Sequence, residues 1–170
     1  MSMKKFENNV TMAGILMKHT LEETTYGEGV ECIRGEVIIR TADEGEHAVK
    51  FFANKYKKDA NGQFTSEENK IYKSLVTVMN EFKTLEEYPD NPDYVEITSA
   101  SFGVNDYVSK NTNEIVTINT ISSNFINRIT KEKFEASAPT ANFEVAGVIA
   151  SIKDELIKDE PTGNLDNNNA

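Results

Sequence analysis

The sequence contains no tryptophan, one cysteine and two histidines in 170 residues. The single cysteine, Cys32, leaves neither a disulfide within the chain nor a cysteine zinc site available, and its apolar neighbours predict a small buried side chain. His19 and His47 have no Asp or Cys at the spacing of metal ligands, and no nucleophile–base pair is recognisable. We therefore expect no enzyme, no catalytic residue, no metal site and no cofactor.

Long hydrophobic runs are also lacking. The longest uninterrupted apolar stretches, such as 37–39, are far shorter than the ~20 residues that a membrane-spanning helix requires. No stretch typical of a signal peptide follows Met1. These features predict a cytoplasmic protein without a membrane partner.

Positive charge is sparse. The chain has 18 Lys and Arg against 28 Asp and Glu, a net charge of −10, and residues 134–170 contain only 2 of the basic against 7 of the acidic residues. A uniformly acidic surface would repel nucleic acid. A nucleic-acid partner therefore requires a locally basic groove on an acidic body, an arrangement that an acidic tail often accompanies.

A short sequence motif, here called the phrase, occurs twice in the chain. Val10-Thr-Met-Ala-Gly14 returns as Phe143-Glu-Val-Ala-Gly147, and both copies have the pattern of a strand. Glycine inside a strand indicates a sharp bend or a close backbone approach, which small barrels need in their first strand. The repeat could also arise by chance. Our interpretation divides the chain into a complete barrel at 1–133, a linker at 134–142, and the start of a truncated second barrel with an acidic and polar tail at 143–170.

The order of elements predicts the fold class. Alternating and β-rich segments predict strands at 10–19, 32–40, 47–56, 94–108 and 115–121, with loops at 22–29 and 55–65. Ser66 is the expected N-cap of an amphipathic helix that Tyr88-Pro89 ends. Three strands, a helix and two strands are the layout of the mainly β, five-stranded Greek-key barrel that binds oligonucleotides or oligosaccharides, the OB-fold. Other small barrels or an α+β sheet fit the same order, and 143–157 would add a C-terminal β segment.

Alternation along the second and third strands predicts a binding face. Ile33, Val37 and Val49 should point inward, while cationic and aromatic side chains point outward. Single-stranded nucleic acid is held by cations along its backbone and by aromatic rings on which bases stack. The expected binding residues are Arg34, Arg40, Lys50, Phe52, Lys55, Tyr56, Lys57 and Lys58. In the alternative, the two rings lie under the helix and the lysine run only solubilises a loop.

Several motifs within 10–129 carry a resemblance to a known family. They are Gly14-Ile-Leu-Met, Ile33-Arg-Gly-Glu-Val-Ile-Ile-Arg40, Lys50-Phe-Phe-Ala-Asn-Lys55, Tyr72-Lys-Ser-Leu75 and Ala100-Ser-Phe-Gly103. Together they resemble the OB-fold single-stranded DNA-binding proteins of bacteriophages that infect Gram-positive hosts. The resemblance implies a protein that coats exposed DNA strands during replication and recombination, without sequence preference, in the bacterial cytoplasm. The competing hypothesis is an acidic protein-interaction or virion assembly module that binds no nucleic acid.

The C-terminal segment has its own expected partners. A strand at 143–157 would carry an unpaired edge, which folded proteins normally cover. We expect it to pair with an edge of the first barrel or with the same segment of another copy in a homo-oligomer. The acidic residues beyond it would bind replication or recombination proteins, and 161–170 would form a mobile end.

Overall fold

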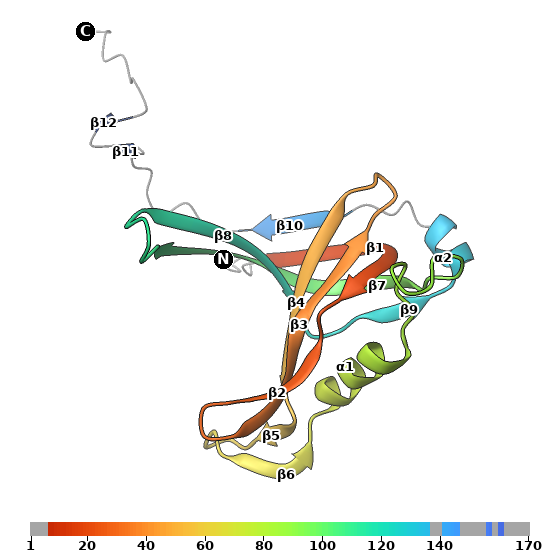
Figure 1. Ribbon diagram of the computed structural model, residues 1–170, viewed down its shortest axis with the longest axis horizontal. Helices are drawn as coiled ribbons and strands as arrows, with labels where there is room; N and C mark the ends of the chain where they lie inside the picture. Colours follow the sequence, from red (N-terminus) through yellow and green to blue (C-terminus); the bar gives the residue numbers. More distant parts are fainter. Residues whose placement is uncertain (1–6, 137–140, 147–155, 158–159, 162–170) are drawn as a thin grey trace, which may run out of the picture.

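Five strands are joined by a closed ring of backbone pairings (Figure 1). The computed structural model describes residues 7–136, 141–146, 156–157 and 160–161. The ring strands are β1 (Glu7–His19), β3 (Val30–Arg40), β4 (Glu46–Asn54), β7 (Tyr94–Val108) and β8 (Ile115–Ser123). The ring closes because β1 pairs antiparallel with both β3 and β7. The prediction of a mainly β fold is thus confirmed.

The order of strands around the ring is β1, β3, β4, β8, β7. The pairs β3–β4 and β7–β8 are antiparallel, whereas β4 and β8 run parallel, with Val49 opposite Ile121 and Lys50 opposite Ser122. Helix α1 (Lys70–Glu81) lies between β4 and β7 along the chain. The long elements therefore follow each other in the order expected from the sequence.

The core lies inside the ring. The inward alternation predicted for β3 and β4 is confirmed, because Ile33, Val37 and Val49 are fully buried. The predicted buried thiol of Cys32 is also confirmed. Leu75 of α1 is fully buried in the same cluster, so the helix docks by one face. Burying a side chain of this size contributes about 1.5–3 kcal/mol.

Gly14 is where β1 changes partners. A Cβ atom at Gly14 would lie 2.2 Å from the carbonyl oxygen of Arg40 on β3, a distance that no side chain tolerates. The predicted close backbone approach is therefore confirmed. The second copy of the phrase, around Gly147, lies outside the described residues.

Two segments expected to be loops form strands. Residues 22–29 contain β2 (Glu22–Tyr26), which pairs antiparallel with β3 through a turn at Gly27 and Gly29, where φ is +54° and +87°. Residues 55–65 contain most of a second hairpin, β5 (Tyr56–Lys58) with β6 (Phe64–Glu68). Both predictions of loops were wrong, because these short strands are stabilised by pairing across the hairpin and lack a buried alternating face.

The helix is shorter than predicted. Its N-cap is Asn69, whose side-chain oxygen accepts a hydrogen bond of 3.0 Å from the backbone N–H of Ile71. Ser66, the expected cap, lies in β6, where the segment leading to the helix is held by β5. The helix ends at Glu81, because Phe82 adopts an extended conformation well before Pro89.

Shorter elements flank the ring. They are β9 (Asn127–Ile129), α2 (Lys131–Ala136), β10 (Asn142–Ala146), β11 (Leu156–Ile157) and β12 (Glu160–Pro161). β10 pairs antiparallel with the first half of β1, which agrees with the expected pairing of the C-terminal segment with an edge of residues 1–133, the first unit of the chain. The predicted linker begins inside α2, and most of the predicted tail lies outside the described residues. Among the helices described, none is both long and apolar enough to cross a membrane.

Candidate nucleic-acid interface

An open groove of about 770 Å³ lies on the outer face of the sheet. The strand register explains its construction, since Arg34 on β3 lies opposite Phe52 on β4, and Lys50 lies between Glu36 on β3 and Ser122 on β8. All five side chains line the groove. Three of the eight predicted binding residues are therefore brought together here.

One aromatic ring of the groove, that of Phe52, forms an exposed pair with a ring from outside the groove lining. Phe52 is 49% exposed, so it does not lie under the helix. Its ring centroid lies 5.8 Å from that of Tyr26 on β2. The hydroxyl of Tyr26 donates a hydrogen bond of 2.8 Å to Asn54 Oδ1, which anchors the ring over the sheet. Sequence reasoning missed Tyr26, although its position before Gly27-Glu-Gly29 is a hairpin signal.

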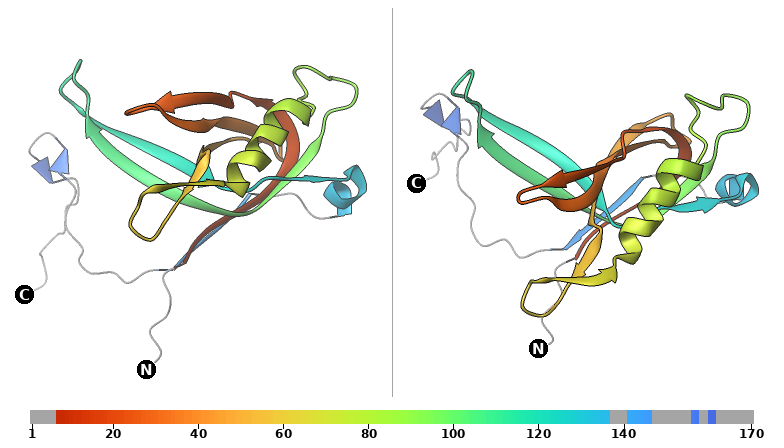
Figure 2. Two further views of the ribbon diagram at one scale, coloured as in Figure 1. Left: turned by 90° about the horizontal axis from the view of Figure 1, so that it is seen from below. Right: turned by 60° about the horizontal axis from the view of Figure 1, so that its bottom comes forward.

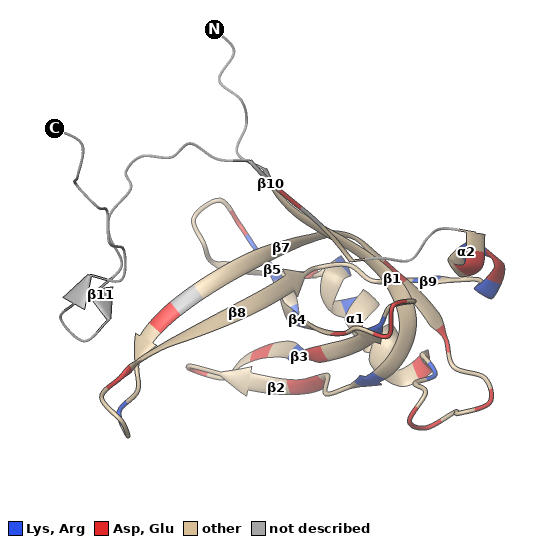
Figure 3. Cartoon of the chain, turned by 90° about the horizontal axis from the view of Figure 1, so that it is seen from above, with Lys and Arg blue, Asp and Glu red and all other residues tan. Residues whose placement is uncertain are grey.

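The cations of the groove are matched by carboxylates. Arg34 Nε lies 3.4 Å from Glu22 Oε1, and Lys50 Nζ lies 3.9 Å from Glu36 Oε1. Accordingly, acidic residues lie along both β2 and β3 (Figure 3). All four side chains are substantially exposed, so these pairs are open to exchange with solvent and with a ligand.

Two further predicted residues lie elsewhere. Arg40 is at the far end of the β3–β4 ladder, where it forms an ion pair of 2.7 Å with Glu46. Lys55 follows β4 and forms a 2.7 Å ion pair with Glu31. The hydrogen bond to Glu31 raises the pKa of Lys55, which holds the ammonium in its charged form against that carboxylate. Neither residue lines the groove.

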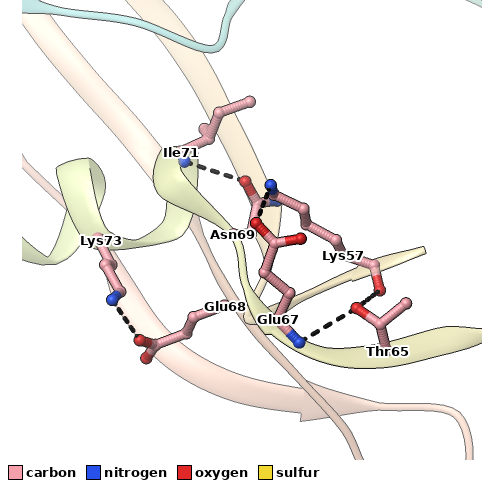
Figure 4. A network of polar contacts seen from close by, with 7 residues as sticks. All are labelled: Lys57, Thr65, Glu67, Glu68, Asn69, Ile71 and Lys73. Carbon is pink, nitrogen blue, oxygen red and sulfur yellow. Dashed lines mark hydrogen bonds and ion pairs between the residues drawn. The ribbon is translucent and has the colours of Figure 1, made fainter. Parts of the chain in front are cut away.

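The remaining predicted residues belong to the β5–β6 hairpin. Tyr56 is half-buried, and the ammonium of Lys57 donates a hydrogen bond to Glu67 (Figure 4). Lys58 Nζ lies 4.7 Å from the centroid of the Phe64 ring. Lys57 and Lys58 therefore do not form one basic strip with Arg34 and Lys50, because both are held by partners within their own hairpin.

A second hollow of about 250 Å³ adjoins the groove. The two hollows share Ser122, Ser123 and Asn124 at the end of β8. Beyond these residues lie Ser101, which is opposite Ser122 in the β7–β8 ladder, and Phe125, which is 53% exposed. The groove thus passes from a charged and aromatic section to a neutral section with hydroxyl, amide and aromatic groups.

Other chemistry has little support in the part of the chain that the structure describes. No group of three or more His, Cys, Asp or Glu residues there is arranged to hold a metal ion. Burial raises the pKa of the Cys32 thiol, which favours its unreactive protonated form. The expectation that the chain is not an enzyme stays a prediction.

Comparison with known families gives a match to the model named YorF over residues 7–167. The chain belongs to the YorF family. A search of curated proteins gives no match. The family match spans the whole ring together with α2 and β10, so the groove belongs to the part of the chain that defines YorF membership. It assigns no ligand, and the resemblance to single-stranded DNA-binding proteins stays a prediction.

Proposed function

We propose that the chain binds single-stranded DNA across the groove of β3, β4 and β8, without sequence preference, and coats exposed strands during bacteriophage DNA replication or recombination. The observation that carries the proposal is the exposed ring of Phe52, paired with that of Tyr26, in a groove that Arg34 and Lys50 also line. Aromatic faces accept any base, and each stacked base contributes about 1–3 kcal/mol. Cations beside the rings meet the phosphates that connect the bases.

The strand order supports an OB-type barrel as the finer description of the fold. A ring in the order β1, β3, β4, β8, β7, with a parallel pair at β4–β8 and a helix before β7, matches the Greek-key layout of that fold. OB-folds use the face of their second and third strands to bind oligonucleotides. The second and third ring strands in this chain are β3 and β4, which carry Arg34, Lys50 and Phe52.

The ion pairs of the groove do not prevent phosphate binding. Exposed ion pairs contribute only about 0–1 kcal/mol, because water screens both partners. A phosphate that meets Arg34 and Lys50 replaces Glu22 and Glu36, which turn out into solvent. Binding then depends on competition between carboxylates and phosphates, so added salt weakens it.

The test is a fluorescence-anisotropy titration of the full chain with a labelled oligothymidylate and with a duplex of similar length, at a series of salt concentrations. We expect binding to the single strand that weakens as salt rises, and much weaker binding to the duplex. Equal affinity for both forms, or no binding to the single strand at low salt, would overturn the proposal.

A second candidate, a protein-interaction or virion assembly module, is favoured by the pairing of candidate cations with carboxylates. Such a module would give no anisotropy change with either oligonucleotide at any salt concentration. The same titration therefore separates the two candidates.

A further inference from the structure

The β7–β8 hairpin extends beyond the ring as a two-stranded arm (Figures 1 and 2). Residues 103–108 of β7 pair with 115–120 of β8. β1 pairs with β7 only as far as Ala100, and β4 pairs with β8 only at Ile121 and Ser122. Along the arm, the outer edge of each strand has no strand partner among the described residues.

The arm exposes apolar side chains on both faces. Ile115 is 74% exposed and lies opposite Val108, which is 57% exposed. The exposed large hydrophobic residues of the arm are Val104, Tyr107, Val108, Ile115 and Ile118. A two-stranded hairpin is marginally stable alone in water, and exposed apolar clusters of this kind mark interaction surfaces.

The edge of β2 and the edge of β8 along the arm differ in their protection. β2, also an edge strand, begins with Glu22 and Glu23, the kind of charge that blocks pairing between copies. The nine residues of β8 include no charged residue, no proline and no glycine, and the strand is tan along its length in Figure 3, without the blue or red of charged residues. β8 therefore has none of these sequence features that normally prevent an edge from pairing with another strand.

We propose that the arm is a self-association surface on which β8 of one copy pairs antiparallel with β8 of a second copy. Two identical edges related by a two-fold axis are complementary in their hydrogen bonds, since where residue i of one copy meets residue j of the second, residue j meets residue i. The four-stranded ribbon so formed brings the exposed Ile115 and Ile118 beside side chains of the partner's β8. This association is independent of the proposed DNA binding, because none of 103–120 lines the groove.

Charge limits which surface of the chain a second copy can approach. With a net charge of −10, two copies of the chain repel each other over most of their surfaces. At an uncharged edge such as β8, two acidic chains can approach each other without repulsion between like charges. A nucleic-acid occupant is disfavoured at the same place, because 103–109 and 115–123 contain no Lys or Arg to meet phosphates.

The test compares one substitution on the two edge strands of the full chain. Asn119→Lys, at an exposed position of β8, places a cation on each of the two edges that meet. Thr25→Lys is the matched control, because Thr25 is exposed on the β2 edge. By light scattering after size exclusion, we expect the parent and Thr25→Lys at twice the chain mass of 19.0 kDa, and Asn119→Lys mainly at the single mass.

The expected weakening of self-association by Asn119→Lys is tenfold or more, about 1.4 kcal/mol. A parent chain that is monomeric at its highest soluble concentration overturns the proposal, as does equal dimerisation of the two variants. Hydrogen exchange gives the position of the contact: amides of 115–120 should exchange more slowly as protein concentration rises. If protection there does not depend on concentration, the edge is covered from within the same chain, and the proposal is wrong.

Discussion

The ring of Tyr26 lies 5.8 Å from that of Phe52, centroid to centroid, with an angle of 60° between the ring planes. The two residues come from β2 and β4, on either side of β3. Because the Tyr26 hydroxyl is held by Asn54, the platform exists before any ligand binds. A preformed platform loses little side-chain entropy on binding, which favours stacking of bases on it.

Replacing both rings should therefore weaken binding of single-stranded DNA. For Tyr26→Ala with Phe52→Ala we expect a loss of roughly 2–4 kcal/mol in anisotropy titrations, since two stacking faces are removed. Tyr88→Ala is the control, because Tyr88 is as exposed as Phe52, at 49%, but its ring lies beside Lys83, outside the groove. A double variant that binds as tightly as the parent would show that the two rings are not part of the binding site. A double variant that melts far below the parent would show that the rings stabilise the fold.

Neutralising a carboxylate of the groove should have the opposite effect. Glu36→Gln releases Lys50 from its pair, so we expect affinity for single-stranded DNA to rise about two- to fivefold at moderate salt. Glu135→Gln is a matched control, because Glu135 forms an exposed pair with Lys131 on α2, outside the groove. The same increase for both variants would indicate a general charge effect, and no increase for Glu36→Gln would show that Lys50 does not meet phosphate.

The long elements were predictable because their patterns are redundant. β3 and β4 each repeat the inward position several times, from Ile33 to Ile39 and from Val49 to Ala53, so one ambiguous residue does not change the prediction. β2 has no such pattern, since four of its five residues are exposed. Its stability comes from pairing with β3, and a single-segment pattern contains no information on that pairing.

The electrostatics of the site were not predictable for a related reason. Counting outward cations placed Lys55 among the binding residues. Its ion-pair partner Glu31 is 24 positions away in the chain and becomes a neighbour only through the fold. The helix start shows the same limit. Ser66 and Asn69 are both acceptable N-caps, and pairing of β6 with β5 selects Asn69.

Tyr72 should give the stability a dependence on alkaline pH. Burial against the core, together with the hydrogen bond its hydroxyl donates to Glu23, raises the pKa of Tyr72 well above the usual value of about 10. The raised pKa means that the stabilisation is fully present below pH ~10 and is lost as pH rises above it, because the unfolded chain releases the phenolic proton first.

The measurement is urea unfolding of the parent and of Tyr72→Phe at neutral pH and above pH ~10. We expect the variant to be less stable by about 1–2 kcal/mol at neutral pH, from the lost hydrogen bond, and the difference to shrink at alkaline pH. A difference that stays constant over this range would contradict the assignment to Tyr72. All other ionisable groups are common to the two proteins, so their contributions cancel in the comparison.

Gly14→Ala tests the close approach of β1 and β3. The added Cβ would meet the backbone of Arg40, which cannot move without disturbing the ladder, so we expect a loss of roughly 2–3 kcal/mol in stability. Gly45→Ala is the control, because its Cβ would meet only side-chain atoms, the nearest at 3.1 Å from His47. If both variants unfold at the same urea concentration, the contact at Gly14 does not constrain the ring.

The last prediction concerns β10 as a structural part of the first unit. β10 covers the outer edge of β1 from Glu7 to Thr11, and its position opposite the fully buried Val10 means that removing it uncovers both backbone and apolar surface. A chain that ends at Thr140 should be less stable than one that ends at Ala146 by roughly 1–2 kcal/mol, while a chain that ends at Lys158 should match the full protein. Urea unfolding of the four proteins gives the comparison, because only the step from Ala146 to Thr140 removes the strand itself. Equal midpoints for these two shorter chains would show that the pairing with β1 contributes nothing to stability, and the segment would then have to be assigned to a separate unit.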